Sequence, residues 1–375
     1  MERIGVFFGG KSCEHEVSVI TALQAMAELE YEYEIYPVYI TEYGWFTGEK
    51  LKYAESYKNF NEKLHTKIIL DGKKLVSYGK FGFLKVVGEI DVAFLCMHGG
   101  AGEGGGLAGM LEMYDVPYTS SSILPSSICL NKQIFKVVAR EKGFRVVPGI
   151  CVSKNDFLSN EEGICDKIIS KYGLDVIVKP VDMGSSVGVN APQNKNELKD
   201  ALSLVFCYTN KALVEKKISN MIELNCAGVR FGSSVIVSAI EKPLKRRGEV
   251  LSYRDKYLSK SKERSDEREI PADISPRLAS KIRKTTQKLY EEFDLVGVVR
   301  VDYMYQEDTG ELYVNEVNTI PGSMSGYLFE ECELDYSCLA KGMIEYAKDR
   351  EREKEEYLTH YSSELLSGNY FVAKS

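Results

Sequence analysis

The chain has 375 residues, a length that predicts two or three domains. Hydrophobic residues make up 44% and charged residues 27%, a composition typical of a globular protein. Its 48 Lys and Arg against 55 Asp and Glu give a formal net charge of −7, which argues against a nucleic-acid or anionic-membrane surface. Since no apolar run reaches the length of a signal peptide or a membrane span, we expect a cytoplasmic protein with no nucleic-acid or membrane partner.

The first third of the chain alternates apolar runs with helical patterns. Residues 4–8, 35–40 and 91–97 are rich in β-branched and aromatic side chains and are predicted as strands. Residues 17–29 have helical periodicity, and glycines follow the first and third strands. This alternation predicts a parallel α/β domain over residues 1–121. A helix is expected to follow, from about residue 122 to about residue 142.

The remainder is predicted to contain two further domains and a tail. Residues 122–212 carry a strand at 176–180, and residues 213–348 carry a charged loop at 242–268 and a helix at 276–293. Two apolar runs at 297–305 and 311–317, joined by a turn, predict a β-hairpin. Residues 349–375 begin with a run of alternating charges that predicts a solvated helical tail.

The predicted hairpin has polar side chains at two-residue spacing on both strands. Arg300 and Asp302 share one face of the first strand, and Glu316 and Asn318 share one face of the second. Antiparallel pairing would bring the oxygens of Asp302, Glu316 and Asn318 together, and Mg²⁺ prefers such ligands when phosphates and water complete its shell. A solvated polar face with an ion pair is the alternative, and spacing alone leaves both open.

Three glycine-rich stretches could bind a ligand. Lys179 ends a strand and precedes the loop that holds Ser185 and Ser186, which offers a cation, N–H groups and hydroxyls to phosphate oxygens. Glu14 follows the glycine-rich turn at residues 9–12, and His98 begins a glycine-dense stretch at residues 98–106. Each stretch taken alone also fits an ordinary turn, a helix cap or a plain loop.

Taken together and in this order, these stretches resemble the D-alanine–D-alanine ligases of the ATP-grasp superfamily. The matching segments are residues 9–18, 98–112, 131–133, 178–189, 213–218, 255–257, 300–303 and 316–322. The resemblance implies an ATP-grasp fold in which the first domain binds substrate and ATP lies between the central and C-terminal domains. It implies an ADP-forming ligase that joins two D-alanines through an acyl phosphate for peptidoglycan synthesis, with ATP and Mg²⁺ (or Mn²⁺) as cofactors. The family is usually dimeric, so the resemblance allows a homodimer.

The resemblance also assigns roles to single residues. ATP binding falls to Lys132, Lys179, Ser186, Glu215, Lys216, Ile218, Glu223 and Lys256, and metal binding falls to Asp302, Glu316 and Asn318. Catalytic roles fall to Glu14, Ser185, Tyr257, Arg300 and Gly322, and substrate binding falls to His98, Ser323, Tyr327 and Leu328. The first three catalytic residues would form a hydrogen-bonded triad, while Arg300 and the N–H of Gly322 would stabilise an oxyanion.

Departures from the family pattern concern the second substrate, the acceptor. Tyr327 stands where the family typically has a serine that binds the acceptor carboxylate, and Gly104 and Ala108 replace an aspartate and a glutamine. The alternatives are therefore the same chemistry with D-serine, D-lactate or another amine as acceptor, or a nucleotide-binding regulator without turnover. Tyr257 speaks against a hydroxy-acid acceptor, and the complete set of polar hairpin residues speaks against a regulator.

Overall fold

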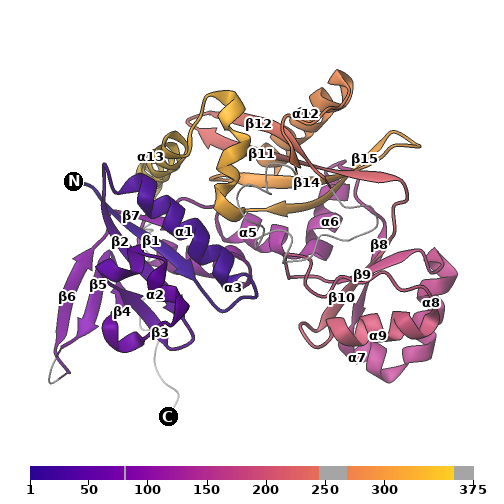
Figure 1. Cartoon of the computed structure of the whole chain (residues 1–375), viewed down its shortest axis with the longest axis horizontal. Coiled ribbons are helices and arrows are strands. Elements are labelled where there is room, and N and C mark those ends of the chain that lie inside the picture. The colour runs from indigo at the N-terminus through magenta and orange to yellow at the C-terminus, as the bar shows by residue number, and fades with distance from the viewer. Residues whose placement is uncertain (80–81, 245–267, 359–375) are drawn as a thin grey trace, which may run out of the picture.

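The computed structural model describes residues 1–79, 82–244 and 268–358, which form three β-sheets with helices packed on them (Figure 1). The sheet built by the first third of the chain lies at the left of Figure 1, and the other two lie toward the right. This mixed α/β architecture confirms the predicted fold class.

The first sheet has a parallel part and an antiparallel part, in the order β6-β5-β4-β3-β2-β1-β7. Strands β1 (Arg3–Gly9), β2 (Glu34–Thr41) and β7 (Val92–Leu95) are parallel and confirm the three predicted strands. Strands β3 (Gly44–Thr47), β4 (Thr66–Asp71), β5 (Lys74–Tyr78) and β6 (Leu84–Glu89) extend the sheet in antiparallel fashion. The prediction of a parallel layer was incomplete, because connections as short as that between β4 and β5 permit only antiparallel pairing.

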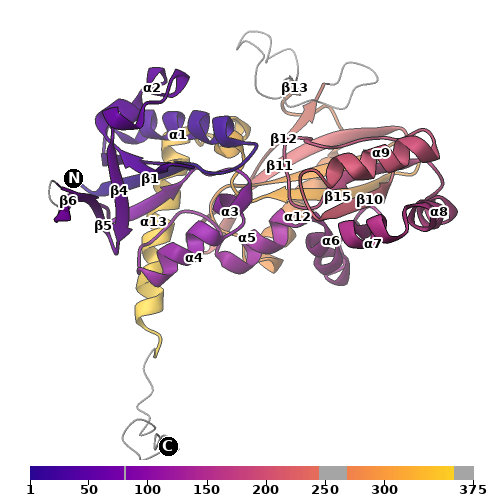
Figure 2. The ribbon, with the colours of Figure 1, turned by 90° about the horizontal axis from the view of Figure 1, so that it is seen from below.

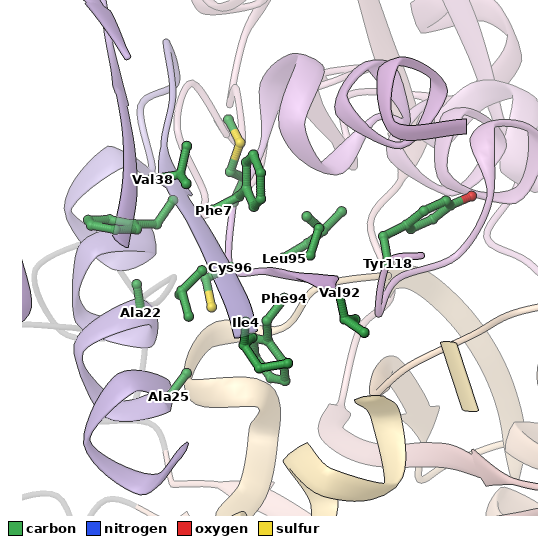
Figure 3. Packing of buried hydrophobic residues seen from close by; sticks show 14 of the residues in the cluster. Ile4, Phe7, Ala22, Ala25, Val38, Val92, Phe94, Leu95, Cys96 and Tyr118 are labelled. Atoms are coloured by element: carbon green, nitrogen blue, oxygen red, sulfur yellow. The ribbon is translucent and has the colours of Figure 1, made fainter. Parts of the chain in front are cut away.

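Helix α1 (His15–Leu29) packs on the parallel part of this sheet and confirms the helix predicted at residues 17–29. Ala22 and Ala25 lie three residues apart and so share one face of the helix, which points toward Ile4 and Cys96 (Figure 3). All four side chains are fully buried. Their burial fixes the start of α1, and with it Glu14, beside the carboxyl end of β1. Helices α3 (Gly100–Glu103) and α4 (Gly106–Met113) follow β7.

A small antiparallel sheet occupies the middle of the chain. Its order is β8 (Gly149–Ser153), β10 (Lys211–Lys216) and β9 (Val176–Pro180). Helices α7 (Lys154–Ser159), α8 (Glu161–Tyr172) and α9 (Lys195–Val205) contribute to its hydrophobic core. The predicted strand at residues 176–180 is confirmed and ends at the candidate phosphate-binding loop.

The third sheet is antiparallel and has the order β13-β12-β11-β14-β15. Its strands are β11 (Met221–Phe231), β12 (Ser234–Pro243), β13 (Arg268–Glu269), β14 (Val299–Gln306) and β15 (Glu311–Asn318). The last two strands pair as the predicted hairpin, and helix α12 (Pro276–Glu292) confirms the helix predicted at residues 276–293. Most of the predicted charged loop, residues 245–267, lies outside the described residues.

The helix predicted at residues 122–142 is in fact two helices, α5 (Ile123–Leu130) and α6 (Lys132–Glu141). Asn131 separates them because its backbone is extended and its side chain accepts a hydrogen bond from the N–H of Ile134 at 3.1 Å. An asparagine in this position caps the helix that follows it. The break places Lys132 in the first turn of α6, where its side chain turns toward the cavity described below.

The short elements and the C-terminal helix complete the described chain. They are α2 (Glu55–Lys58), α13 (Tyr336–Glu355) and the 3₁₀ helices η1 (Glu49–Lys52), η2 (Glu62–Leu64), η5 (Gly322–Leu328) and η6 (Glu330–Cys332). None of the helices in the described ranges is long and apolar enough to cross a membrane.

The predicted domain boundaries stay predictions, but the packing crosses two of them. Cys129 of α5 and Phe135 of α6 belong to the core of the five-stranded sheet, whereas the prediction groups them with residues 122–212. Strand β10 spans the predicted boundary at residue 213 and pairs within the small sheet. Helix α13, which runs beside the first sheet in Figure 2, likewise continues past residue 348, the last residue before the predicted tail.

The cap at Asn131 generates a local prediction. Asn131→Ala should weaken the start of α6 by about 1 kcal/mol, because the N–H of Ile134 loses its acceptor. Amide hydrogen exchange at Ile134 should then be roughly fivefold faster, whereas exchange in α12 should not change. Asn131→Ser is the matched control, since serine caps equally well and should restore slow exchange. Equal rates in the alanine and serine variants would show that the side chain does not cap α6.

Candidate active site

A cavity of about 1000 Å³ opens between the small sheet, the five-stranded sheet and the end of α1. The sequence-predicted residues that line it are Lys132, Lys179, Ser185, Ser186, Glu223, Arg300, Asp302, Glu316, Gly322, Ser323 and Tyr327. These residues come from segments almost 200 positions apart in the chain. The fold therefore brings most of the predicted site residues into one place.

The β14–β15 hairpin supplies the polar face that the spacing predicted. Arg300 lies opposite Asn318, and Asp302 lies opposite Glu316. Directly opposed residues of an antiparallel pair project to the same face, so the four polar groups are neighbours. The register shifts immediately after Asp302, and such bulges are common beside functional sites because they redirect side chains.

Arg300 and Asp302 form a two-pronged ion pair. Nε of Arg300 lies 2.6 Å from Oδ1 of Asp302, and Nη2 lies 2.9 Å from Oδ2. The side-chain amide of Asn318 also donates to Oδ2 of Asp302, at 3.2 Å. Burial disfavours the charge on Arg300, but Asp302 outweighs that effect and keeps the pKa of the guanidinium well above its usual value. The guanidinium is thus a fixed positive charge facing the cavity.

Lys179 belongs to a buried charge cluster that the sequence showed only in part. Its Nζ lies 2.5 Å from Oε2 of Glu215, whose Oε1 lies 2.7 Å from Nζ of Lys136. Burial lowers the pKa of Lys136 to about 8, although Glu215 opposes the change. Two lysines on one carboxylate leave an excess of positive charge, which suits an anionic ligand. Lys136 was missed, although it lies four residues after Lys132 on one helix face.

The side chain of Glu215 is held away from the open cavity. It is buried between two lysines and is not among the cavity-lining residues, and neither are its neighbours Lys216 and Ile218 in the described part of the chain. Glu223, on β11, does line the cavity. The assignment of these four residues to the nucleotide stays a prediction.

Lys132 reaches the opposite side of the same region. Its Nζ donates a hydrogen bond to the carbonyl of Met183 at 2.6 Å and lies 3.5 Å from Oε2 of Glu316. It therefore connects the loop after β9 to the polar face of the hairpin. The two predicted phosphate-binding lysines converge on the cavity from different elements, α6 and β9.

The loop after β9 closes onto the start of α1. Ser185 donates a hydrogen bond from its hydroxyl to the carboxylate of Glu14, which confirms the predicted proximity of these two residues. A Cβ atom on Gly184 would lie 2.6 Å from an oxygen of Glu14, so only glycine allows this approach. Ser185 and Ser186 have left-handed backbone conformations, with φ values of 51° and 59°. The third predicted member of the triad, Tyr257, lies outside the described residues, as does Lys256.

His98 is buried and hydrogen-bonded to the protein. Its Nε2 lies 2.9 Å from the hydroxyl of Thr21, and that oxygen accepts the N–H of Ser323 at 3.0 Å. Thr21 therefore connects His98 to the backbone of Ser323. Burial lowers the pKa of His98 to about 4, and the nearby Arg300 acts in the same direction. His98 is therefore neutral at pH 7, and its contact with Thr21 was not predicted.

The segment held by Thr21 is strained. Ser323, Met324 and Ser325 all have left-handed backbones, with φ values of 52°, 49° and 44°, at a cost of about 1–3 kcal/mol for each non-glycine residue. Leu328 anchors the end of this turn in the hydrophobic core, where it is fully buried and does not line the cavity. The predicted contact of Leu328 with substrate would therefore involve its backbone, because its side chain is buried.

Glu103 is a second residue whose importance was not predicted. Its Oε1 accepts the N–H of Thr319 at 3.1 Å, and its Oε2 accepts the N–H of Gly99 at 2.8 Å. Burial raises the pKa of Glu103 to about 7, and the negative charge of Glu14 adds to that effect. Glu103 therefore joins the loop of His98 to the loop that begins at Asn318. Its position in the glycine-dense stretch at residues 98–106 was the sequence feature that could have indicated this role.

Two family models match most of this chain. Residues 3–121 match the family model described as D-ala D-ala ligase N-terminus, and residues 138–345 match the model described as D-ala D-ala ligase C-terminus. The D-alanine–D-alanine ligase of Thermosipho melanesiensis is 34% identical over 364 residues, which cover 94% of this chain and 96% of the relative. That of Chloroherpeton thalassium is 33% identical over 365 residues, covering 94% and 98%.

Solved structures give the same picture. The D-alanine–D-alanine ligase of Coxiella burnetii is 25% identical and superposes with a TM-score of 0.77, covering 94% of this chain and 96% of that one. The VanG D-Ala:D-Ser ligase of Enterococcus faecalis is 26% identical and superposes with a TM-score of 0.75, covering 92% and 99%. Both structures share the fold of this chain over nearly its whole length.

The contact between Thr21 and His98 can be tested without an activity assay. Thr21→Val removes the hydroxyl and leaves the N–H of Ser323 without its acceptor, so the turn at residues 323–325 should loosen by about 1–3 kcal/mol. We expect faster amide exchange at Ser323 and a changed ¹⁵N shift at Nε2 of His98. Thr21→Ser, which keeps the hydroxyl, should leave both signals in place. A valine variant with native signals would contradict the contact.

Proposed function

The chain belongs to the D-alanine–D-alanine ligase family, and we propose that it joins two molecules of D-alanine while converting ATP to ADP and phosphate. One observation carries this proposal: a single cavity is lined by two lysines suited to phosphate, by the oxygen-rich face of the hairpin, and by Arg300 and Gly322. A carboxylate is a poor acyl donor, so a ligase needs a site for phosphorylation next to a site for acyl transfer. The cavity provides both kinds of group.

The triphosphate of ATP is expected to bind between Lys132 and Lys179. Both side chains now face carboxylates, Glu316 and Glu215 respectively. Phosphate oxygens are stronger acceptors for an ammonium than water, and the excess charge supplied by Lys136 favours their entry. The backbone N–H groups and hydroxyls of residues 184–186 would cover the phosphates from the other side.

The polar face of the hairpin fits a divalent metal ion. Asp302 and Glu316 are direct cross-strand neighbours, and Asn318 contacts Asp302 at 3.2 Å. The donor set is composed of hard oxygens, which suits Mg²⁺ and also Mn²⁺. The ion pair with Arg300 is compatible with ligation, because each carboxylate has about four lone-pair positions. When bound, the ion would neutralise charge on the transferring phosphoryl group.

The first chemical step would phosphorylate the first D-alanine. Its carboxylate oxygen attacks the γ-phosphorus, the bond from that phosphorus to the β–γ bridging oxygen breaks, and ADP leaves an acyl phosphate behind. Glu14, which accepts a hydrogen bond from Ser185, would bind the ammonium group of this D-alanine. Lysines and Arg300 stabilise the charge that spreads over the phosphoryl oxygens.

The second step would form the peptide bond. The amine of the second D-alanine attacks the acyl carbon and releases a proton, and the C–O bond to phosphate then breaks. Arg300 and the N–H of Gly322 would stabilise the tetrahedral oxyanion that forms between these events. Neutral His98 and Thr21 hold the turn that presents Gly322. The dipeptide would serve peptidoglycan synthesis in the cytoplasm.

A second candidate keeps this chemistry but uses D-serine as the acceptor. One observation favours it: Tyr327 replaces the serine typical of the family. The fold allows it, since a D-Ala:D-Ser ligase superposes on this chain about as well as a D-alanine–D-alanine ligase does. The ratio of kcat/KM for D-alanine and D-serine as acceptors, with D-alanine as donor, separates the two candidates. A ratio above one supports the first candidate, and a ratio below one supports the second.

The hairpin carboxylates provide the direct test of ATP turnover. Glu316→Gln should lower phosphate release by about 100-fold or more at saturating Mg²⁺, because one charged oxygen ligand is replaced by a neutral amide. Glu311→Gln is the matched control on the same strand, since Glu311 contacts Arg145 and Tyr313 instead of the cavity. Turnover at the native rate in the Glu316 variant would refute the assignment of this face to the metal.

A further inference from the structure

The acceptor end of the cavity has a polar cluster centred on Glu241, a residue of β12 with a side chain only 5% exposed. Its Oε2 accepts two hydrogen bonds, from the hydroxyl of Tyr327 at 3.0 Å and from the side-chain amide of Asn225 at 3.0 Å. A phenol has one proton to donate. Tyr327 has therefore committed its proton to a protein carboxylate and cannot donate it to the carboxylate of a ligand.

Arg268 stands beside this cluster and also lines the cavity. Its guanidinium carbon lies 4.7 Å from the centre of the Tyr327 ring, and its Nη1 lies 3.4 Å from Oε1 of Glu241. The ring and the carboxylate thus hold the guanidinium from two sides. Within the ranges that the structure describes, Arg268 donates no hydrogen bond of normal length, so most of its five N–H groups remain available to a ligand.

The other cations that line the cavity have protein partners at hydrogen-bond distance. Lys179 contacts Glu215 at 2.5 Å, and Lys132 donates to the carbonyl of Met183 at 2.6 Å. Arg300 uses two of its nitrogens on Asp302. Among the cavity-lining cations of the described chain, Arg268 is therefore the one whose donors are least used.

Arg268 also shares its cavity with Arg300 and Gly322, the groups proposed to act on the oxyanion, and with Tyr327. Burial and Glu241 raise the pKa of the Tyr327 phenol, and both guanidinium groups oppose that rise. An acceptor amino acid that reacts beside Arg300 and Gly322 would therefore occupy the cavity into which Arg268 also projects.

We infer that Arg268 binds the α-carboxylate of the acceptor amino acid, with Tyr327 as the surface on which the guanidinium lies and Glu241 as its anchor. This inference rests on the proposed function and names the group that recognises the second substrate. It assigns Tyr327 a positioning role for Arg268 in place of direct contact with the acceptor carboxylate. The ligand class is a D-amino acid with a free carboxylate.

The test compares acceptors with and without that carboxylate. D-alaninamide cannot be phosphorylated, so it acts only as an acceptor when D-alanine is the donor. Arg268→Met should raise the KM for D-alanine as acceptor by roughly tenfold to a hundredfold, the value of a charge-assisted hydrogen bond. The KM for ATP should stay within about twofold of native. For D-alaninamide as acceptor, the variant and the native enzyme should have the same KM, because this acceptor has no carboxylate for the guanidinium to bind.

Two control variants sharpen the result. Arg268→Lys keeps a cation and should restore part of the acceptor affinity, and Arg277→Met removes an exposed arginine of α12 and should change nothing. If Arg268→Met raised the KM for D-alanine and D-alaninamide equally, or raised neither, the inference would be overturned. The proposed function would still stand, provided that the native enzyme forms the dipeptide. A native enzyme that forms no dipeptide from D-alanine or D-serine would overturn the proposed function itself.

Discussion

The site depends on the pairing of every strongly buried cation with a carboxylate of the protein. Arg300 is held by Asp302, Lys179 and Lys136 share Glu215, and Lys132 faces Glu316. Unpaired charges in such a place would cost several kcal/mol each. The pairs keep the cations charged and aimed at the cavity before any ligand arrives. Phosphate and carboxylate groups of substrates then compete for cations that are already in position.

The fold makes these pairs because two sheets and helix α6 meet around the cavity. The small sheet contributes Lys179 and Glu215, the hairpin contributes Asp302 and Glu316, and α6 contributes Lys132 and Lys136. Helix α6 begins where it does because Asn131 interrupts the preceding helix. The acceptor end is built differently: a tyrosine there is hydrogen-bonded to Glu241 and lies under an arginine. The cations that pair with carboxylates and the cluster around Tyr327 thus line one and the same cavity.

Local spacing predicted the hairpin well, since two-residue alternation on both strands determines which side chains share a face. The resemblance then brought Lys132, Lys179 and Arg300 to the same site, and the structure places them there. Contacts between distant segments could not be predicted in this way. The bond from Thr21 to His98 joins residues 77 positions apart, and that from Glu103 to Thr319 joins residues 216 apart. The antiparallel half of the first sheet was missed because its short polar strands carry a weak pattern.

The central claim is that an acyl phosphate forms on one D-alanine before its carbonyl carbon is attacked by another amine. The most direct measurement supplies the enzyme with ATP, Mg²⁺ and D-alanine labelled with ¹⁸O in both carboxylate oxygens. If the acyl phosphate forms, one carboxylate oxygen bridges to phosphorus and leaves with it. The dipeptide should then retain ¹⁸O in its peptide carbonyl, and the inorganic phosphate should carry one ¹⁸O atom for each dipeptide formed. Phosphate free of label, released in step with the dipeptide, would contradict this claim.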